Sequence, residues 1–483
     1  MRECECRLAS RCADRYTGLT MPTVSEESVV EDPPVVDNQP SNSTTVNQVS
    51  RISDAAAAHE NRNFVVLALY QIVMRTGWIF KTESIVMPAV LDTITGGGPL
   101  GGVLRGCLPA LNRFGHSIPP ILFSRRLKVL PQKRLVMLAT TFAMASMFLL
   151  LSVMWWQVGS PVPWWMPGLF LLAYFAFFVA TGINNLAFGT LQGKLIGVTR
   201  RGRLLLVANV TGAATAIIAV ALLMPAWLTP EGGRFEMIFG FTALCFFVAA
   251  VLVLLLSEPQ DNFSEPSRGA RHLFASAWEI VRTDRNFRRL GWVAMAFGMS
   301  LALFPHYQAL GRSERLGLSF DNILNWLIIQ NVGTAIFSLL TGPIADRRGN
   351  RLVMQGVMLG IAAMPLTALG LSYLPTWGPT LYPGVFLFIG LTPVGFKTFS
   401  NYTLEISANE DHPRYLSTLG LCFALPLLLS PVLGLVVEMI GFEAVFVSVS
   451  VVLVMGWLLT FGLQEPRHTT FEDTPVTVVP EDD

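Results

Sequence analysis

Apolar stretches alternate with short polar segments along most of the chain. From residue 62 onward these stretches are close to the roughly 20 residues that a helix needs to cross a bilayer. They lie at 63–91, 99–123, 134–156, 165–190, 204–228, 236–256, 288–310, 322–344, 351–374, 381–407, 415–437 and 442–463. Because lipid offers the backbone no hydrogen-bond partner, each stretch is predicted to be a helix. The pattern therefore predicts an all-α polytopic membrane protein with twelve transmembrane helices.

The two ends of the chain have a different character. Residues 1–61 are polar and rich in Pro, Ser, Asn and acidic side chains, and they lack helical or strand periodicity. They and residues 465–483 are predicted to be disordered tails. Residues near Met1 do not form the apolar run of a signal peptide. Met21 begins a segment of more uniform low complexity, so it is predicted as an alternative start of translation. An intact mass of the purified protein would test this.

Basic residues are distributed unequally between the two sets of loops. One set carries the Lys and Arg clusters of 125–134, 194–203, 268–289 and 347–351, whereas the other carries only Arg234, Arg312 and Arg315. Loops rich in Lys and Arg face the cytoplasm. Both termini and the long middle loop are therefore predicted to be cytoplasmic, in a multi-pass protein of the cell inner (plasma) membrane.

The second half of the chain repeats a pattern of the first. Phe235, Glu236 and Phe239 precede a span that Glu258-Pro259 closes, and the same spacing recurs in Phe442, Glu443, Phe446 and Glu465-Pro466. The repeat predicts two pseudo-symmetric six-helix bundles, at 62–257 and 288–464, with a cytoplasmic connector at 258–287. Internal duplication is common in transporters, where the solute site lies between the two halves.

Composition excludes several classes of protein. The chain is 52% hydrophobic and 14% charged, and a soluble domain would be roughly a quarter charged. The six cysteines lack metal-ligand spacing, so we expect no metal site and no cofactor. A nucleotide-binding loop and a catalytic grouping are also missing, which argues against a primary pump and an enzyme. The basic loops are explained by topology, so no nucleic-acid partner is implied.

One short segment at a predicted cytoplasmic turn stands out. Residues 342–351 read Gly-Pro-Ile-Ala-Asp-Arg-Arg-Gly-Asn-Arg. Glycine permits a tight turn, and an Asp beside several Arg can form charge-assisted hydrogen bonds to a neighbouring helix end. Such a cluster would latch one conformation. The alternative is that its arginines are ordinary cytoplasmic charges.

This decamer resembles the signature loop of the major facilitator superfamily, which runs Gly, small, Asp, Arg, basic or polar, Gly, then Arg or Lys. Residues 199–203 also match the family's Arg-Gly-Arg loop, and the resemblance covers about 62–467. It implies a monomeric secondary transporter that works by alternating access. The equivalent loop at 124–134 lacks the Asp and the Gly, and the antiporter glycine-proline motif is missing from 207–225. The latch role therefore carries over only to Gly342, Asp346, Arg347, Gly349 and Arg351.

Polar and ionisable side chains within spans are candidates for the solute site, because they are costly in a bilayer. Arg75 and Arg113 come near mid-membrane, and His116 follows Arg113 on a similar face. The resemblance implies that spans one, four, seven and ten wall the central cavity. The candidates for binding solute or a coupling ion are Arg75, Glu83, Arg113, His116, Asn184, Asn185, His306, Gln308, Lys397 and Asn401.

Each candidate has a structural alternative. The asparagines could bond between helices, and a histidine in a helix is often a packing residue. Lys81, Arg105 and Glu405 could extend to the membrane interface. Gly98, Gly102 and Gly106 recur every four residues, which predicts close approach of another helix.

Taken together, the residues predict a secondary active or facilitative transporter of a small solute. Excess positive charge at mid-depth favours an anionic solute. Glu83, His116 or His306 could titrate and couple transport to protons. The alternative is a membrane sensor or receptor that keeps the transporter fold without moving solute.

Overall fold

The computed structural model describes residues 59–157, 162–229, 232–260, 270–407 and 411–465. These residues are almost entirely helical, with one antiparallel pair of two-residue strands, β1 (Leu228–Thr229) and β2 (Gly232–Gly233). The prediction of an all-α polytopic membrane protein is confirmed. Apart from 59–61 and Glu465, the predicted tails lie outside the described residues.

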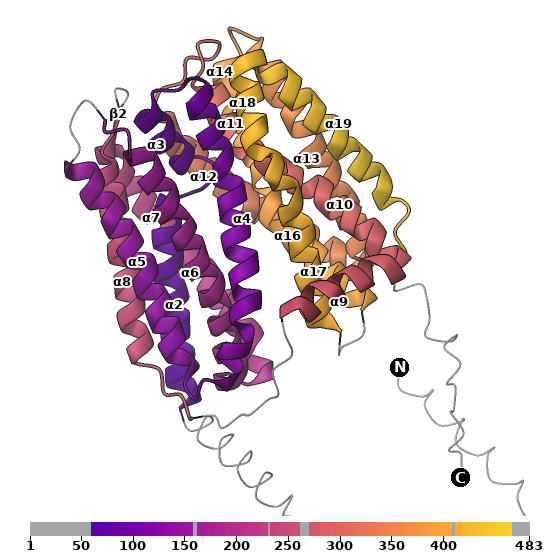
Figure 1. The fold of residues 1–483 in the computed structure, drawn as a ribbon. Coiled ribbons are helices and arrows are strands. Elements are labelled where there is room, and N and C mark those ends of the chain that lie inside the picture. The colour runs from indigo at the N-terminus through magenta and orange to yellow at the C-terminus, as the bar shows by residue number, and fades with distance from the viewer. Residues whose placement is uncertain (1–58, 158–161, 230–231, 261–269, 408–410, 466–483) are drawn as a thin grey trace, which may run out of the picture. The chain divides into compact units, whose positions relative to one another are not determined.

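The helices fall into two sets that follow each other along the chain (Figure 1). The first set consists of α2 (Glu60–Phe80), α3 (Val86–Thr95), α4 (Gly98–Val129), α5 (Lys133–Gln157), α6 (Met166–Leu195), α7 (Val198–Trp227) and α8 (Phe235–Leu254). Its helices pack mainly on one another, as in the pairs α5 with α8, α4 with α6 and α2 with α7.

The second set follows a connecting helix, α9 (Ala270–Thr283), which the sequence did not predict. It consists of α10 (Arg285–Ala302), α11 (Phe304–Gly311), α12 (Asn322–Arg348), α13 (Asn350–Ser372), α14 (Gly378–Leu381), α15 (Pro383–Ile389), α16 (Leu391–Ile406), α17 (His412–Ala424), the 3-10 helix η1 (Leu425–Leu429), α18 (Ser430–Ile440) and α19 (Phe442–Thr460).

Within the described residues, 11 helical segments are long and apolar enough to cross a membrane. The predicted span that falls short of this criterion is the second one, α4, which is 32 residues long. It carries Arg105, Arg113 and His116, and these side chains lower its overall hydrophobicity. Polar residues of this kind are tolerated in a span only where they face other helices or a cavity.

Four predicted spans are interrupted, where the sequence predicted continuous helices. The first breaks between Phe80 and Val86, the seventh at Leu303, the tenth at Gly390, and the eleventh changes to a 3-10 turn at 425–429. Pro305 and Pro426 explain two of these breaks, because proline cannot donate a helical hydrogen bond. At the first break, Thr82 Oγ1 donates to Ile79 O at 2.7 Å, so a side chain bonds a backbone carbonyl near the end of α2.

The internal repeat of the sequence has a structural counterpart. The side chain of Asn63, at the start of the first set, accepts from Ser257 N at 2.9 Å and donates to Ser257 O at 3.0 Å. In the second set, Asn286 Oδ1 accepts from Gln464 N at 3.1 Å. Ser257 and Gln464 each precede the repeated Glu-Pro. In both sets, therefore, an asparagine near the beginning joins the first helix to the segment that follows the last.

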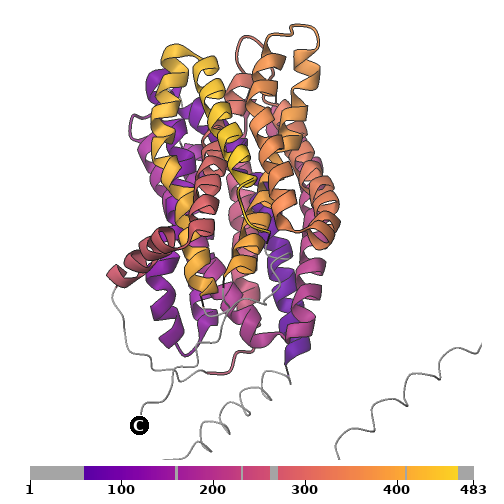
Figure 2. The same ribbon diagram turned by 90° about the vertical axis from the view of Figure 1, so that its right-hand side faces the viewer.

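The two ends of the helical body differ in their loops (Figures 1 and 2). We call the lower end in Figure 1 the basic end. It carries α9, the start of α2 and the short turns after Val129, Leu195 and Arg348. The opposite end carries the β1–β2 hairpin and α14.

Candidate functional site

A cavity of about 230 Å³ lies between the two sets of helices. Both sets contribute to its wall, and the breaks in the helices lie beside it. Its lining residues are Glu83, Ser84, Pro109, Asn112, Arg113, Tyr174, Leu301, Phe304, Gln330, Ile389, Thr392, Pro393 and Phe396. We call it the central pocket.

Three of the four interrupted spans meet at this pocket. Glu83 and Ser84 come from the break between α2 and α3, Phe304 follows the break at Leu303, and Thr392 follows the break at Gly390. Non-helical backbone at membrane depth is tolerated where it is buried in protein or lines a cavity. Transporter binding sites are commonly built from such discontinuous helices.

A lysine and a glutamate lie side by side at the first break. Lys81 Nζ donates to Glu83 Oε1, and its side chain is 0% exposed, whereas that of Glu83 is 25% exposed. The ammonium also lies 3.1 Å from the centroid of the Trp78 ring, with Phe177 and Phe178 at 4.6 and 4.7 Å. Aromatic faces attract cations, so Lys81 is held by the rings and by one carboxylate, and Glu83 faces the pocket.

Arg113 supplies the cationic side of the central pocket. Its guanidinium carbon lies 3.9 Å from the centroid of the Phe396 ring, which belongs to the other set of helices. Among the described residues it has no carboxylate within ion-pair distance, while Glu83 is already paired with Lys81. The pocket and its immediate wall thus hold two cations and one anion, a local excess of one positive charge.

One polar contact crosses the pocket from one set to the other. Ser84 Oγ donates to Gln330 Oε1 on α12 at 2.8 Å. Tyr174 and Asn112, from α6 and α4, add polar atoms on the first set's side. The central pocket therefore combines one arginine, one glutamate and several hydrogen-bonding side chains in a wall that is otherwise apolar.

The structure separates the predicted site residues into groups. Of the ten candidates, Glu83 and Arg113 line the central pocket. Arg75 does not, because its Nη1 donates to Asn209 Oδ1 on α7 at 3.0 Å. Asn184 is buried inside the first set, where its Oδ1 accepts from Tyr70 OH at 2.8 Å and its Nδ2 donates to Thr141 Oγ1 at 2.8 Å. Arg75 and Asn184 therefore lie outside the lining of the central pocket, and their role in binding stays a prediction.

Other candidates lie nearer the basic end than the pocket. His116 Nε2 is 3.2 Å from Asn185 Nδ2, which pairs α4 with α6 one turn below Arg113. Lys397 and Asn401 are exposed and follow Pro393 at intervals of four residues, on the same face of α16. They do not line the central pocket.

His306 and Gln308 belong to a different cluster, near the opposite end. Arg105 donates from Nη1 to Asp92 Oδ1 at 2.7 Å and from Nη2 to Glu438 Oε1 at 2.5 Å. With its amide nitrogen toward Asp92, Gln308 donates to Oδ2 at 3.3 Å. His306 is fully buried in α11 and has no hydrogen-bond partner among the described side chains. Neither residue lines the central pocket, and their role in binding stays a prediction.

Glycines bring α4 and α18 together beside this cluster. A Cβ on Gly434 would lie 2.0 Å from Gly102 O, and one on Gly106 would lie 2.3 Å from Ser430 O. Ser430 Oγ also donates to Gly106 O at 2.6 Å. The predicted close approach is confirmed for Gly102 and Gly106, whereas Gly98 has nothing nearby. Together with Arg105, these contacts close the opposite end of the interface between the sets.

The predicted latch lies at the end of α12. The helix runs through Gly342 to Arg348, so the turn is made by Gly349, with φ of 88°, and not by Gly342. Arg351 Nη2 donates to Phe461 O at 2.8 Å, and Arg347 is exposed. Asp346 lies in the last turn of α12, and its side chain is not among those that the structure describes.

Several pocket residues were missed by sequence reasoning. Ser84, Gln330 and Phe396 contribute an inter-set hydrogen bond and an aromatic platform. Gln330 had a usable signal, since it is a polar residue inside an apolar span. Phe396 had none, because aromatic residues are frequent in every span.

Comparisons with known proteins agree with this architecture. The sequence pattern of the Major Facilitator Superfamily matches residues 309–480. The uncharacterized MFS-type transporter YfnC of Bacillus subtilis (strain 168) is 27% identical over 142 residues, which is 29% of this chain and 33% of YfnC. The chain thus spans about a third of the length of the curated relative that it matches.

Two crystal structures show the same fold. A variant of the nucleoside transporter NupG superposes with a TM-score of 0.65 at 12% identity, covering 83% of this chain and 100% of that one. A POT family transporter in complex with 5-aminolevulinic acid gives 0.64 at 13% identity, covering 85% and 97%. At these identities the likeness establishes the fold and leaves the solute undefined.

Proposed function

We propose that this chain is a member of the major facilitator superfamily that transports a small organic anion across a membrane. Its fold and the family pattern in residues 309–480 support the proposal. The observation that carries the proposal is Arg113. It is a cation that forms no ion pair among the described residues, and it faces a pocket built at the breaks of three helices. A carboxylate or phosphate of the solute would supply the missing partner.

The described contacts support alternating access at this pocket. The Arg105 cluster and the α4–α18 glycines join the two sets toward the opposite end. The basic end faces the cytoplasm in our proposal, because Lys and Arg concentrate in its loops. In this conformation the pocket is then closed toward the outside. Separation of α4 from α18 would open it to the outside.

Proton coupling is assigned to Glu83. Protonation of this carboxyl would remove the charge that balances Lys81, and the buried Lys81 and the pocket-lining Arg113 would then both lack an anion. A proton and an anion would thus favour each other's binding, which is the arrangement of a symporter. We expect Glu83→Gln to abolish accumulation driven by a pH gradient while solute exchange at equal pH persists, measured in proteoliposomes with the two sides buffered separately. Unchanged gradient-driven accumulation in this variant would place the coupling elsewhere.

Asp346 is proposed as the conformational latch at the basic end. Its place beside Arg347 and Gly349, where α12 turns into α13, suits a carboxylate that holds one state through charge-assisted hydrogen bonds. We expect Asp346→Asn to cut the transport rate at least tenfold with normal membrane insertion, measured as initial uptake per inserted molecule. Wild-type uptake would refute the latch.

The experiment that tests the function uses the purified full-length protein. A panel of organic anions, matched neutral analogues and cations is screened by thermal shift, because a ligand that binds only the folded state raises its apparent stability. Hits are then tested for counterflow in proteoliposomes. Stabilisation by anions together with counterflow supports the proposal. Binding without counterflow would favour a sensor, and stabilisation by neutral analogues alone would refute the anionic solute.

A further inference from the structure

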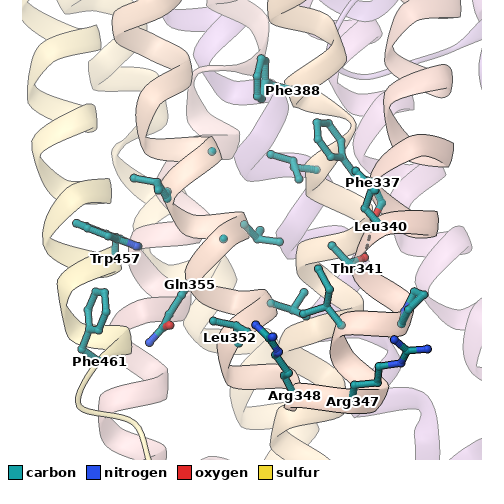
Figure 3. Close-up of a pocket in the computed structure, with 18 residues that line it drawn as sticks. Phe337, Leu340, Thr341, Arg347, Arg348, Leu352, Gln355, Phe388, Trp457 and Phe461 are labelled. Carbon is teal, nitrogen blue, oxygen red and sulfur yellow. Dashed lines mark hydrogen bonds between the residues drawn. The ribbon is translucent and has the colours of Figure 1, made fainter.

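A second cavity, of about 750 Å³, lies on the second set of helices, away from the central pocket (Figure 3). Its wall is formed by α12 and α13, with Phe388 and Leu391 at its far end and Trp457 and Phe461 of the α19 region on one side. It shares no lining residue with the central pocket. We call it the lateral groove.

The lateral groove is apolar and open to the surroundings of the helices. Leu340 is 58% exposed and Phe461 is 52% exposed, although both are large hydrophobic side chains in or beside a membrane-spanning helix. A Cβ on Gly356, midway along the groove, would meet no atom within 4 Å, so the floor at this point is empty space. From Leu352 to Gly360, the part of α13 along the groove is about 12 Å long. A groove of this kind fits an extended hydrocarbon chain.

One end of the groove is cationic. Arg347 and Arg348 occupy the last turn of α12 at the basic end, and both are exposed. Neither has a hydrogen bond or an ion pair with another side chain in the part of the chain that the structure describes. In Figure 3 both arginines lie at the same end of the groove, with Arg348 beside Leu352 and Gln355.

We propose that the lateral groove binds an anionic phospholipid, with an acyl chain along Gly356 and the headgroup phosphate on Arg347 and Arg348. Basic pockets between membrane helices recognise such headgroups, and each Arg near an anionic leaflet adds to the attraction. Apart from the two arginines, only Thr341, Gln355 and Trp457 among the lining side chains carry polar atoms, so the groove suits a lipid rather than a polar solute. A bound lipid would brace the α12–α13 turn.

The test measures lipid binding with two independent variants. Delipidated full-length protein in neutral detergent is titrated with phosphatidylglycerol or phosphatidylcholine, and bound lipid is counted by native mass spectrometry. We expect wild type to prefer phosphatidylglycerol. Arg347→Gln with Arg348→Gln should weaken that binding roughly 30-fold, because two arginine attractions are lost. Gly356→Leu should weaken it at least tenfold by filling the floor, with both charges intact.

The controls separate this site from general charge effects. Arg203→Gln removes an exposed arginine from the basic end of the first set, and it should bind phosphatidylglycerol like wild type. Equal binding of the two lipids by wild type, or wild-type affinity in Gly356→Leu, would overturn the proposal. Glycerol phosphate that competes as well as the whole lipid would also overturn it, because the acyl chain would then be unnecessary. None of these outcomes depends on transport, so the lipid site is tested independently of the proposed function.

Discussion

Replacing Arg113 by glutamine is expected to weaken binding of the anionic solute by about 2–4 kcal/mol, or roughly 30- to 1,000-fold, and to abolish measurable uptake. The reason is that Arg113 is the pocket cation without a carboxylate partner among the described residues. Phe396 holds the guanidinium from the other set of helices, so the charge is already in place before solute arrives. Affinity is measured by isothermal titration in detergent, and uptake in proteoliposomes.

Arg75→Gln is the matched control for that experiment. Both arginines were predicted at mid-membrane, but Arg75 donates to Asn209 between α2 and α7 and does not line the pocket. We expect Arg75→Gln to leave solute affinity within a few-fold of wild type. An equal loss of affinity in both variants would show that the effect is general electrostatics or stability, and a loss in Arg75→Gln alone would contradict the assignment of the site.

Replacing Gly434 by valine is expected to stop transport while leaving solute binding measurable. The new Cβ would lie 2.0 Å from Gly102 O, so α4 and α18 could no longer approach, and the state closed at the opposite end would become inaccessible. A carrier that cannot alternate should lose net flux by at least a hundredfold. The overpacking should also cost about 1–3 kcal/mol of stability in the closed state. Initial uptake and solute binding are measured on the same preparation.

Gly420→Val provides the comparison in the same predicted span. A Cβ on Gly420 would meet no atom within 4 Å, so the same substitution should leave uptake close to wild type. Normal uptake by Gly434→Val would mean that the close approach of α4 and α18 is not required for the transport cycle.

Hydrophobic patterning was sufficient to predict the fold, because crossing a bilayer constrains the length and composition of each helix. The same pattern could not show where a helix is interrupted. Nothing in 81–85 is a strong helix breaker, yet α2 ends at Phe80 and α3 begins at Val86. That interruption is what places Glu83 and Ser84 in the pocket wall.

The site was harder to predict, because it depends on how each helix is rotated about its own axis. The sequence predicts similar membrane depths for Arg75 and Arg113. Only the packing of α2 against α7 turns Arg75 away from the pocket. His306 and Gln308 were predicted to line the cavity, but their position along α11 places Gln308 beside Asp92 and Arg312. Contacts between helices decide such cases, within one set for Arg75 and between the sets for Gln308, and the sequence of a single span does not show them.

The asparagine contacts that join the first and last helices of each set have a consequence for biosynthesis. Both members of the Asn63–Ser257 pair are synthesised before any residue of the second set. Domains that fold as units do so in order of synthesis, so the first six spans can reach a stable arrangement in the membrane while the remainder is still being translated. The contact of Asn286 with Gln464 would then mark the completion of the second half. A chain truncated after residue 257 and released from the ribosome should accordingly resist proteolysis, whereas one truncated before residue 257 should be digested.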